Sequence, residues 1–266
     1  RNRGEDMFQF NIIEGKTKEP FKGIIYGDNG VGKNTFASHA SNVLFLDLEG
    51  NASHLDAPRQ PIKNYEECEG CLKALIDTEH GCKTLVLDSL DRLETYAKDY
   101  LERTYKGNAK ILEYGGKTSK MLSLFSYIIE LLDRLRDKKG MNIILLCHDT
   151  LRPQQELDMP TYSRRELSLD PKISALFQNW SNFIFYAEKE KIFTTVESDN
   201  SYRKNNRKAL RTNIDNRILR TNGHPGLLAK NTWNLPDIIE LTPTPEGWNF
   251  FMESIDTFYN NQSLEA

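Results

Sequence analysis

The chain has 266 residues, 38% of them apolar, a formal net charge of −3 and four cysteines. This composition supports one sizeable α/β domain with a small appendage, and its charge excludes a basic coat protein for nucleic acid. No apolar run approaches the roughly 18 residues of a membrane span, and we expect no signal peptide because the first residues are charged and polar. We therefore expect a cytoplasmic protein without a membrane partner. Residues 1–6 precede the first methionine, and we expect them to be a remnant of cloning that is not part of the fold. The expected core domain covers residues 7–240, and a C-terminal helical tail covers residues 241–266.

The first predicted strand, residues 21–26, leads into a glycine-rich run and then into a helix-compatible segment at 35–40. A strand, a glycine loop and a helix in this order are the setting of a phosphate-binding P-loop. Backbone N–H groups of such a loop turn inward, and the helix N-terminus adds positive charge. Lys33 would neutralise the outer phosphates of a nucleoside triphosphate. The predicted nucleotide site comprises Gly27, Asp28, Asn29, Gly30, Val31, Gly32, Lys33, Asn34 and Thr35.

One residue of this loop departs from the pattern. Asn34 stands where the P-loop has Ser or Thr, whose hydroxyl binds Mg²⁺. An asparagine carbonyl oxygen can replace the hydroxyl, although it lies one bond further out. Thr35 is a poor substitute because the next helical position points about 100° away around the axis. We expect Asn34 to be a metal ligand and the handling of Mg²⁺, and hence hydrolysis, to be weakened.

Two later apolar runs, at 43–48 and 84–87, have the length of strands buried on both faces. Asp88 follows the second run and is the expected second metal-site acid, which holds Mg²⁺ through water in P-loop enzymes. Glu49 follows the first run and is the candidate general base for the attacking water. Asp47 points the same way along the strand and is its main competitor. Glu49 is favoured because it lies nearer the end of the strand and the ligand cleft.

The intervening segments 65–79, 89–105 and 121–138 are amphipathic and predict helices. The first of them raises the alternative of a zinc site, because its two cysteines are followed by a histidine and a third cysteine. The same cysteines also belong to an apolar helix face, and buried cysteine behaves as a small hydrophobic residue. The residues concerned are Cys68, Cys71, His80 and Cys82.

A further apolar strand at 141–148 ends in His148. Strands that alternate with helices indicate a mostly parallel sheet with right-handed crossovers, and ligands bind such sheets at the carboxyl ends of the strands. The P-loop, Glu49, Asp88 and His148 all lie at such ends. His148 is expected to sense the terminal phosphate, or else only to cap its strand.

Beyond residue 150 the pattern weakens. Residues 151–170 are polar and proline-bearing and predict a long mobile loop. A helix at 171–180 and a C-terminal helix at 248–259 are expected, with short strands and a turn between them at 181–187, 191–196, 217–220 and 227–231. The basic segment 203–220 either touches DNA or faces solvent.

Positive side chains in two segments suggest contact with a phosphate backbone, and one aromatic residue suggests stacking on a base. A solvated charged surface is the alternative. The candidate nucleic-acid residues are Lys117 and Lys120 in the polar segment 105–120, and Arg152, Tyr162, Arg164 and Arg165 in the loop after His148.

Together these motifs resemble the RecA-type ATPases, and more narrowly the phage-encoded RecA-like proteins grouped with single-strand annealing recombinases. The resemblance covers roughly residues 7–240. The segments that carry it are 25–27, 30–33, 35–37, 44–50, 84–90, 139–143, 229–231 and 235–236.

The resemblance implies a RecA-like α/β P-loop fold with a mostly parallel central sheet flanked by helices and a small C-terminal extension. It further implies ATP with Mg²⁺, single-stranded DNA as a partner and head-to-tail homo-oligomers in a ring or filament. By position, Glu49 would activate water, His148 would sense the nucleotide, and segments 105–120 and 150–168 would face DNA. Lys230 would reach the ATP site of the neighbouring subunit.

The sequence thus predicts an ATPase that assembles on single-stranded DNA and assists annealing or recombination. One alternative is an ATP-dependent loader or remodeller of a single-strand-binding or other replication protein. The other is a nucleotide-gated regulatory protein with a degenerate site, which Asn34 favours.

Overall fold

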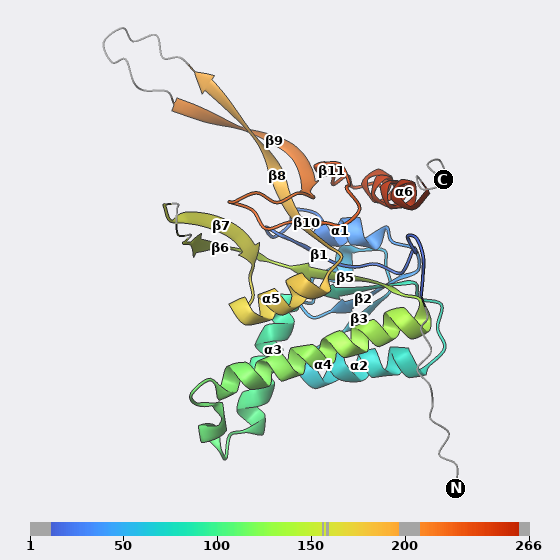
Figure 1. Cartoon of the computed structure of the whole chain (residues 1–266), viewed down its shortest axis with the longest axis vertical. Helices are drawn as coiled ribbons and strands as arrows, with labels where there is room; N and C mark the ends of the chain where they lie inside the picture. The colour runs from blue at the N-terminus through green and yellow to red at the C-terminus, as the bar shows by residue number, and fades with distance from the viewer. Residues whose placement is uncertain (1–11, 156, 158–159, 197–207, 261–266) are drawn as a thin grey trace.

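The computed structural model describes residues 12–155, 157, 160–196 and 208–260. Helices cover both faces of a central sheet (Figure 1), whose strands follow the order β11-β9-β8-β1-β5-β4-β2-β3, with β10 paired to β8. The strands of this sheet are β1 (Lys22–Gly27), β2 (Val43–Asp47), β3 (Arg59–Pro61), β4 (Thr84–Asp88), β5 (Asn142–Cys147), β8 (Phe183–Val196), β9 (Lys208–Arg220), β10 (Lys230–Asn231) and β11 (Ile238–Glu240).

The strands from β8 to β3 are parallel, whereas β9, β10 and β11 are antiparallel to their neighbours. The expected mostly parallel sheet flanked by helices is therefore confirmed. Parallel pairing places the carboxyl ends of β1, β2, β4 and β5 at one edge. This edge holds the residues that the sequence analysis singled out.

The helices are α1 (Lys33–Ser38), α2 (Tyr65–Asp77), α3 (Leu90–Thr104), α4 (Gly116–Lys139), α5 (Pro171–Trp180) and α6 (Glu246–Asn260), with short 3₁₀ helices η1 (Ala52–His54) and η2 (Ala109–Leu112). Successive strand residues point to opposite faces. In β1, Ile24 and Tyr26 pack on the layer formed by α2 to α5, and Ile25 packs on the layer formed by α1 and α6. The P-loop helix therefore has its own apolar support.

The C-terminal helix α6 joins this second layer through aromatic side chains. Phe251 is fully buried and its ring lies 5.7 Å from that of Phe21 and 6.2 Å from that of Phe36, centroid to centroid. Since Phe36 belongs to α1, α6 supports the helix that follows the glycine loop.

The prediction of a long loop over 151–170 is wrong. The chain forms an antiparallel hairpin there, β6 (Asp149–Gln154) and β7 (Tyr162–Leu167), in which Arg152 pairs with Arg164. Apolar alternation is the signal of a strand. This hairpin lacks it, because its charged side chains find partners within the chain instead of apolar burial.

Other boundaries also differ from the prediction. Segments 181–187 and 191–196 are parts of one strand, β8, with a register irregularity between Lys189 and Lys191. Segment 105–120 is not a loop throughout, since α4 begins at Gly116. Cys68 lies fully buried in the apolar core beneath α2, in agreement with its place on an apolar helix face.

The helices of the described part of the chain can be compared with the requirements of a membrane span. None of those helices combines the length and the apolar character that crossing a bilayer requires.

Candidate functional site

The glycine loop joins β1 to α1 in a conformation that depends on glycine. Gly30 and Gly32 have φ angles of 69° and 109°, which L side chains rarely adopt. Gly27 has a φ of 148°, and a Cβ added there would lie 2.1 Å from the carbonyl oxygen of Ala187 on β8. The loop is thus held against the neighbouring strand and turns its backbone toward the N-terminus of α1, as an anion cradle requires.

Lys33 is the cation of this loop. Its side chain is buried, and Nζ donates to the carbonyl oxygens of Gly27 at 2.8 Å and Asp28 at 2.9 Å. Burial lowers the pKa of Lys33, whereas the nearby carboxylates of Asp88 and Glu49 oppose that change. The ammonium group is therefore fixed at the loop before any ligand arrives.

The expected metal side of the site consists of Asn34 and Asp88. Asp88 ends β4 and is buried, and Asn34 Nδ2 donates to its Oδ2 at 2.6 Å. Burial raises the pKa of Asp88 to about 6, and the negative charge of Glu49 adds to this effect. A buried carboxylate beside further acids is stabilised by a cation, so these donors fit Mg²⁺. Asp88 and the carbonyl oxygen of Asn34 are the residues that would hold it.

The two competing acids after β2 have different surroundings. Asp47 is buried, and its carboxylate accepts from the backbone N–H of Gly50 at 2.7 Å and of Ala52 at 3.3 Å. Its hydrogen bonds hold the turn that follows the strand. Glu49 instead lines the cavity beside the loop, and its Oε1 accepts from Ser89 Oγ at 2.5 Å. Of the two, Glu49 is the acid placed toward a ligand.

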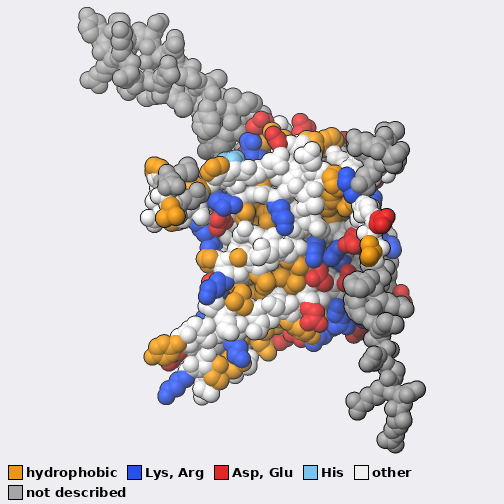
Figure 2. All heavy atoms as spheres, in the orientation of Figure 1, with side chains coloured by type: hydrophobic (Ala, Val, Ile, Leu, Met, Phe, Trp, Pro, Cys, Tyr) orange, Lys and Arg blue, Asp and Glu red, His pale blue; other side chains and the backbone are white. Residues whose placement is uncertain are grey.

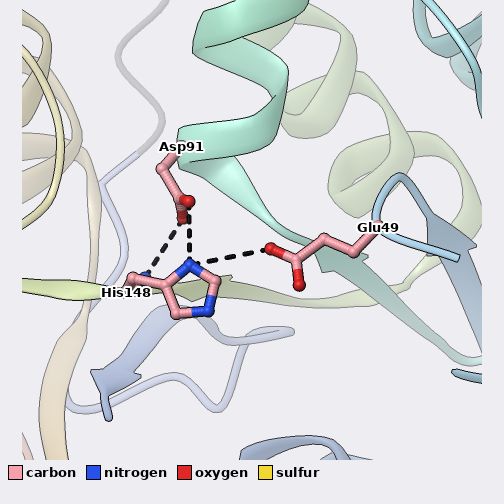
Figure 3. A group of neighbouring side chains, drawn as sticks. All are labelled: Glu49, Asp91 and His148. Atoms are coloured by element: carbon pink, nitrogen blue, oxygen red, sulfur yellow. Dashed lines mark hydrogen bonds and ion pairs between the residues drawn. The ribbon is translucent and has the colours of Figure 1, made fainter. Parts of the chain in front are cut away.

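His148 is hydrogen-bonded to Asp91, a residue of the first turn of α3 that was not predicted from the sequence (Figure 3). The ring Nδ1 donates to Asp91 Oδ2 at 2.8 Å, and the backbone N–H of His148 donates to Asp91 Oδ1 at 3.1 Å. Glu49 Oε1 lies 3.6 Å from the same Nδ1. The hydrogen bond to Asp91 raises the pKa of His148. The signal for Asp91 was its place in the first turn after an acid-ended strand.

These groups converge on one cavity of about 570 Å³. Its walls come from the glycine loop, the segment after β2, the end of β4, the end of β5 and strand β9. The lining residues are Asn29, Gly30, Val31, Gly32, Lys33, Asn34, Thr35, Glu49, Asn51, His54, Asp88, His148 and Arg217. No sequence motif points to Asn51, His54 or Arg217. The last of these comes from a strand far along the chain and carries no local motif.

Lys230 lies elsewhere in the chain. Its Nζ donates to the carbonyl oxygens of Gln178 at 3.1 Å and Ser181 at 2.5 Å, at the end of α5. It does not line the cavity described above. Its expected role concerns the site of a neighbouring subunit, so that role stays a prediction.

The arginines of the β6–β7 hairpin are engaged by the chain itself. Arg165 forms an ion pair with Asp149, and its guanidinium lies 5.6 Å from the ring centroid of Tyr186. Arg152 Nε lies 3.6 Å and Arg164 Nε lies 3.8 Å from carboxylate oxygens of Glu166. These contacts hold the hairpin together, and a nucleic acid would have to compete with them.

The remaining candidate nucleic-acid residues lie on β7 and in the first turns of α4. Tyr162 lies on β7 and is half-buried. In the first turns of α4, Lys117 forms a largely exposed ion pair with Glu102 at 2.7 Å. Lys120 lies 5.6 Å above the ring of Tyr105. An exposed ion pair contributes little stability, so Lys117 could exchange its partner for a phosphate.

One protein family matches this chain. A family model described as "AAA domain" matches residues 19–233, which include the glycine loop, Asp88, His148 and Lys230. Among solved structures, the crystal structure of the RadB recombinase is similar, with 12% sequence identity and a TM-score of 0.40. That similarity covers 65% of this chain and 76% of the other. No curated protein matches the chain.

The raised pKa of Asp88 predicts a stability cost that the site carries without a ligand. The rise from 3.8 to about 6 corresponds to a destabilisation of the folded chain by about 3 kcal/mol. This destabilisation is absent below pH 4, where the carboxyl group is protonated in both states, and it is fully present above pH 6. Asp88→Asn removes the charge and retains an acceptor for Asn34. We therefore expect this variant to raise the free energy of unfolding at pH 8 by up to about 3 kcal/mol, measured by urea denaturation without Mg²⁺.

Asp47→Asn is the matched control, because the Asp47 carboxylate is used by two backbone N–H groups. It should lower the free energy of unfolding by about 1 kcal/mol. Equal or lower stability of Asp88→Asn relative to the natural chain at pH 8 would contradict the electrostatic description of the site.

Proposed function

The chain belongs to the family of AAA domains, and on that basis we propose that it is an ATPase whose nucleotide occupies the cavity beside the glycine loop. The observation that carries this proposal is the meeting of three groups in one hollow of about 570 Å³. These are the buried Lys33 in its glycine loop, the acid pair of Asp88 and Glu49, and His148.

In this proposal each residue has a separate task. The loop N–H groups and Lys33 bind the phosphates and stabilise the charge that develops on them. Glu49, held by Ser89, orients a water and takes its proton. Bound Mg²⁺ would neutralise phosphate oxygens, with Asp88 and Asn34 as its protein partners.

The pairing of His148 with Asp91 supports a route from the nucleotide to the hairpin. His148 lines the cavity, and the next residue, Asp149, begins β6 and forms an ion pair with Arg165 of β7. A shift of His148 on nucleotide binding would therefore act directly on the hairpin, which gives the ATPase a means of changing its affinity for a partner.

We further propose single-stranded DNA as that partner. The β6–β7 hairpin and the connection between α3 and α4 both project at the left of Figure 1. In Figure 2, Lys and Arg side chains are spread down the left side of the face shown with few acidic side chains among them, whereas on the right basic and acidic side chains are mixed. Exposed apolar side chains near these segments, Tyr114 and Leu151, suit contact with unpaired bases.

Head-to-tail assembly, with Lys230 directed at a neighbouring subunit, completes the recombinase-type proposal. Lys230 lies outside the cavity of its own chain, as a residue acting in trans must. A cation supplied by a neighbour stabilises transition-state charge only when the subunits are assembled.

A nucleotide-gated protein with little turnover is the second candidate, and one contact favours it. Asn34 Nδ2 donates to Asp88 Oδ2 at 2.6 Å, so the two residues expected to bind the metal already form a hydrogen bond with each other. Both candidates share nucleotide binding and differ in hydrolysis.

Replacing Glu49 by Gln tests the hydrolytic role. The variant should lose about 10²-fold to 10⁴-fold in kcat, because the amide cannot take the proton, while ATP binding is retained. Glu69→Gln, which changes a glutamate paired with Lys73 on α2, is the control and should leave kcat unchanged. Steady-state phosphate release and calorimetric ATP binding provide the two readouts. Unchanged hydrolysis in Glu49→Gln would exclude Glu49 as the base.

Salt titration of DNA binding tests the proposed partner. Affinity for an oligonucleotide should fall steeply with salt concentration and rise with ATP. The slope of log affinity against log salt concentration should become shallower by about 0.7 for each of Lys117 and Lys120 that is changed to Ala. Lys73→Ala, which removes a lysine that is paired with Glu69 on α2, should leave the slope unchanged. Weak binding without a salt slope or an ATP effect would contradict the DNA role and leave the loader alternative.

A further inference from the structure

Arg217 is a positively charged side chain of the cavity to which no motif assigns a role. It lies near the end of β9, and a Cβ added at Gly32 would lie 3.8 Å from its Nη1 and 3.9 Å from its Cδ. The side chain is half-buried. Within the ranges that the structure describes, its guanidinium has no ion pair, unlike Arg220 three residues later, which is bound to Glu188. Arg217 is thus a cation held beside the phosphate cradle and available to a ligand.

The position of Arg217 along the cavity indicates which part of a ligand it meets. The cavity of about 570 Å³ adjoins two others. It shares Glu49 and Asn51 with one that also contains Asp91, and it shares Gly32, Thr35 and Arg217 with one whose described lining residues include neither acid, so Glu49 and Arg217 lie on different sides of it. In the proposed function, the terminal phosphate faces Glu49. The ribose and the base of the nucleotide would therefore lie on the opposite side, past the first turn of α1.

A second cavity of about 200 Å³ begins on that side. It shares Gly32, Thr35 and Arg217 with the first, and its remaining walls are Leu241, Thr242 and Pro243. The two cavities therefore adjoin each other at Arg217. The second one combines a planar cation with the apolar side chains of Leu241 and Pro243, and the described residues that line it include no carboxylate.

The walls of this second cavity are fixed relative to each other. The backbone N–H of Leu241 donates to the carbonyl oxygen of Arg217 at 2.7 Å. The ring Nε2 of His39, at the end of α1, lies 3.2 Å from the carbonyl oxygen of Pro243. The turn at 241–243 is thereby tied both to β9 and to the P-loop helix, so the cavity exists before a ligand binds.

We propose that this second cavity is the nucleobase subsite, in which the guanidinium of Arg217 stacks on the base opposite the turn at 241–243; this proposal rests on the proposed function. A guanidinium is planar and weakly hydrated, and it stacks on aromatic faces. An apolar wall with one planar cation therefore suits a flat aromatic base better than it suits a phosphate, and it makes Arg217 a binding residue supplied by the same chain.

The test compares ATP with inorganic tripolyphosphate, which has the phosphates without the base. Calorimetry with Mg²⁺ should show that Arg217→Ala weakens ATP binding by about tenfold and leaves tripolyphosphate binding unchanged. Arg220→Ala is the matched control from the same strand and should change neither. An equal loss for both ligands would overturn the subsite and place Arg217 on a phosphate. No loss for either would overturn it as well.

Two further variants keep the test independent of folding. Thr242→Trp should fill the second cavity and weaken ATP but not tripolyphosphate, and retained tripolyphosphate binding itself demonstrates a folded P-loop. Arg217→Lys retains the charge without the planar group, so it should weaken ATP nearly as much as Arg217→Ala. Full recovery by lysine would overturn stacking. Failure of the unaltered chain to bind either ligand would overturn the proposed function, a result distinct from failure of the subsite alone.

Discussion

The crowding of like charges at one edge of the parallel sheet is the constraint on which the site depends. Burial and the charge of Glu49 raise the pKa of Asp88 to about 6, and Lys33 is the one lysine among the described residues that line the cavity. The fold enforces this arrangement, because parallel strands deliver their carboxyl ends to the same place. A bound cation and phosphates would balance the charges. The site is therefore organised for a ligand at some cost to the empty protein.

Much of this edge is readable in the sequence because its signals are local. The glycine loop needs positive φ at Gly30 and Gly32, which only glycine supplies readily, so the motif is visible as letters. Strands buried on both faces appear as continuous apolar runs, and the acids that end β2 and β4 stand out against them. The helices at 65–77 and 90–104 follow from apolar periodicity in the same way.

The rest depends on contacts between distant segments, which leave no local pattern. Arg217 reaches the glycine loop only because β9 pairs with β8, which in turn pairs with β1. In the sequence, Asp91 is an acid in the first turn of a helix, which is a common position for an acid. Its bond to His148 forms only because the fold places the end of β5 beside α3. The prediction of a loop is wrong for the β6–β7 hairpin because its strands are held by pairs such as Arg165 with Asp149 instead of by an apolar face. Charge pairing of this kind has no period in the sequence.

A crystal structure with Mg²⁺ and a non-hydrolysable ATP analogue tests the central claim most directly. We expect the terminal phosphate between Lys33 and Glu49, the cation beside Asp88, and the hydrogen bond from Asn34 Nδ2 to Asp88 replaced by contacts with the cation. An analogue bound elsewhere, or a glycine loop left empty with the bond between Asn34 and Asp88 intact, would contradict the assignment of this edge as a triphosphate site.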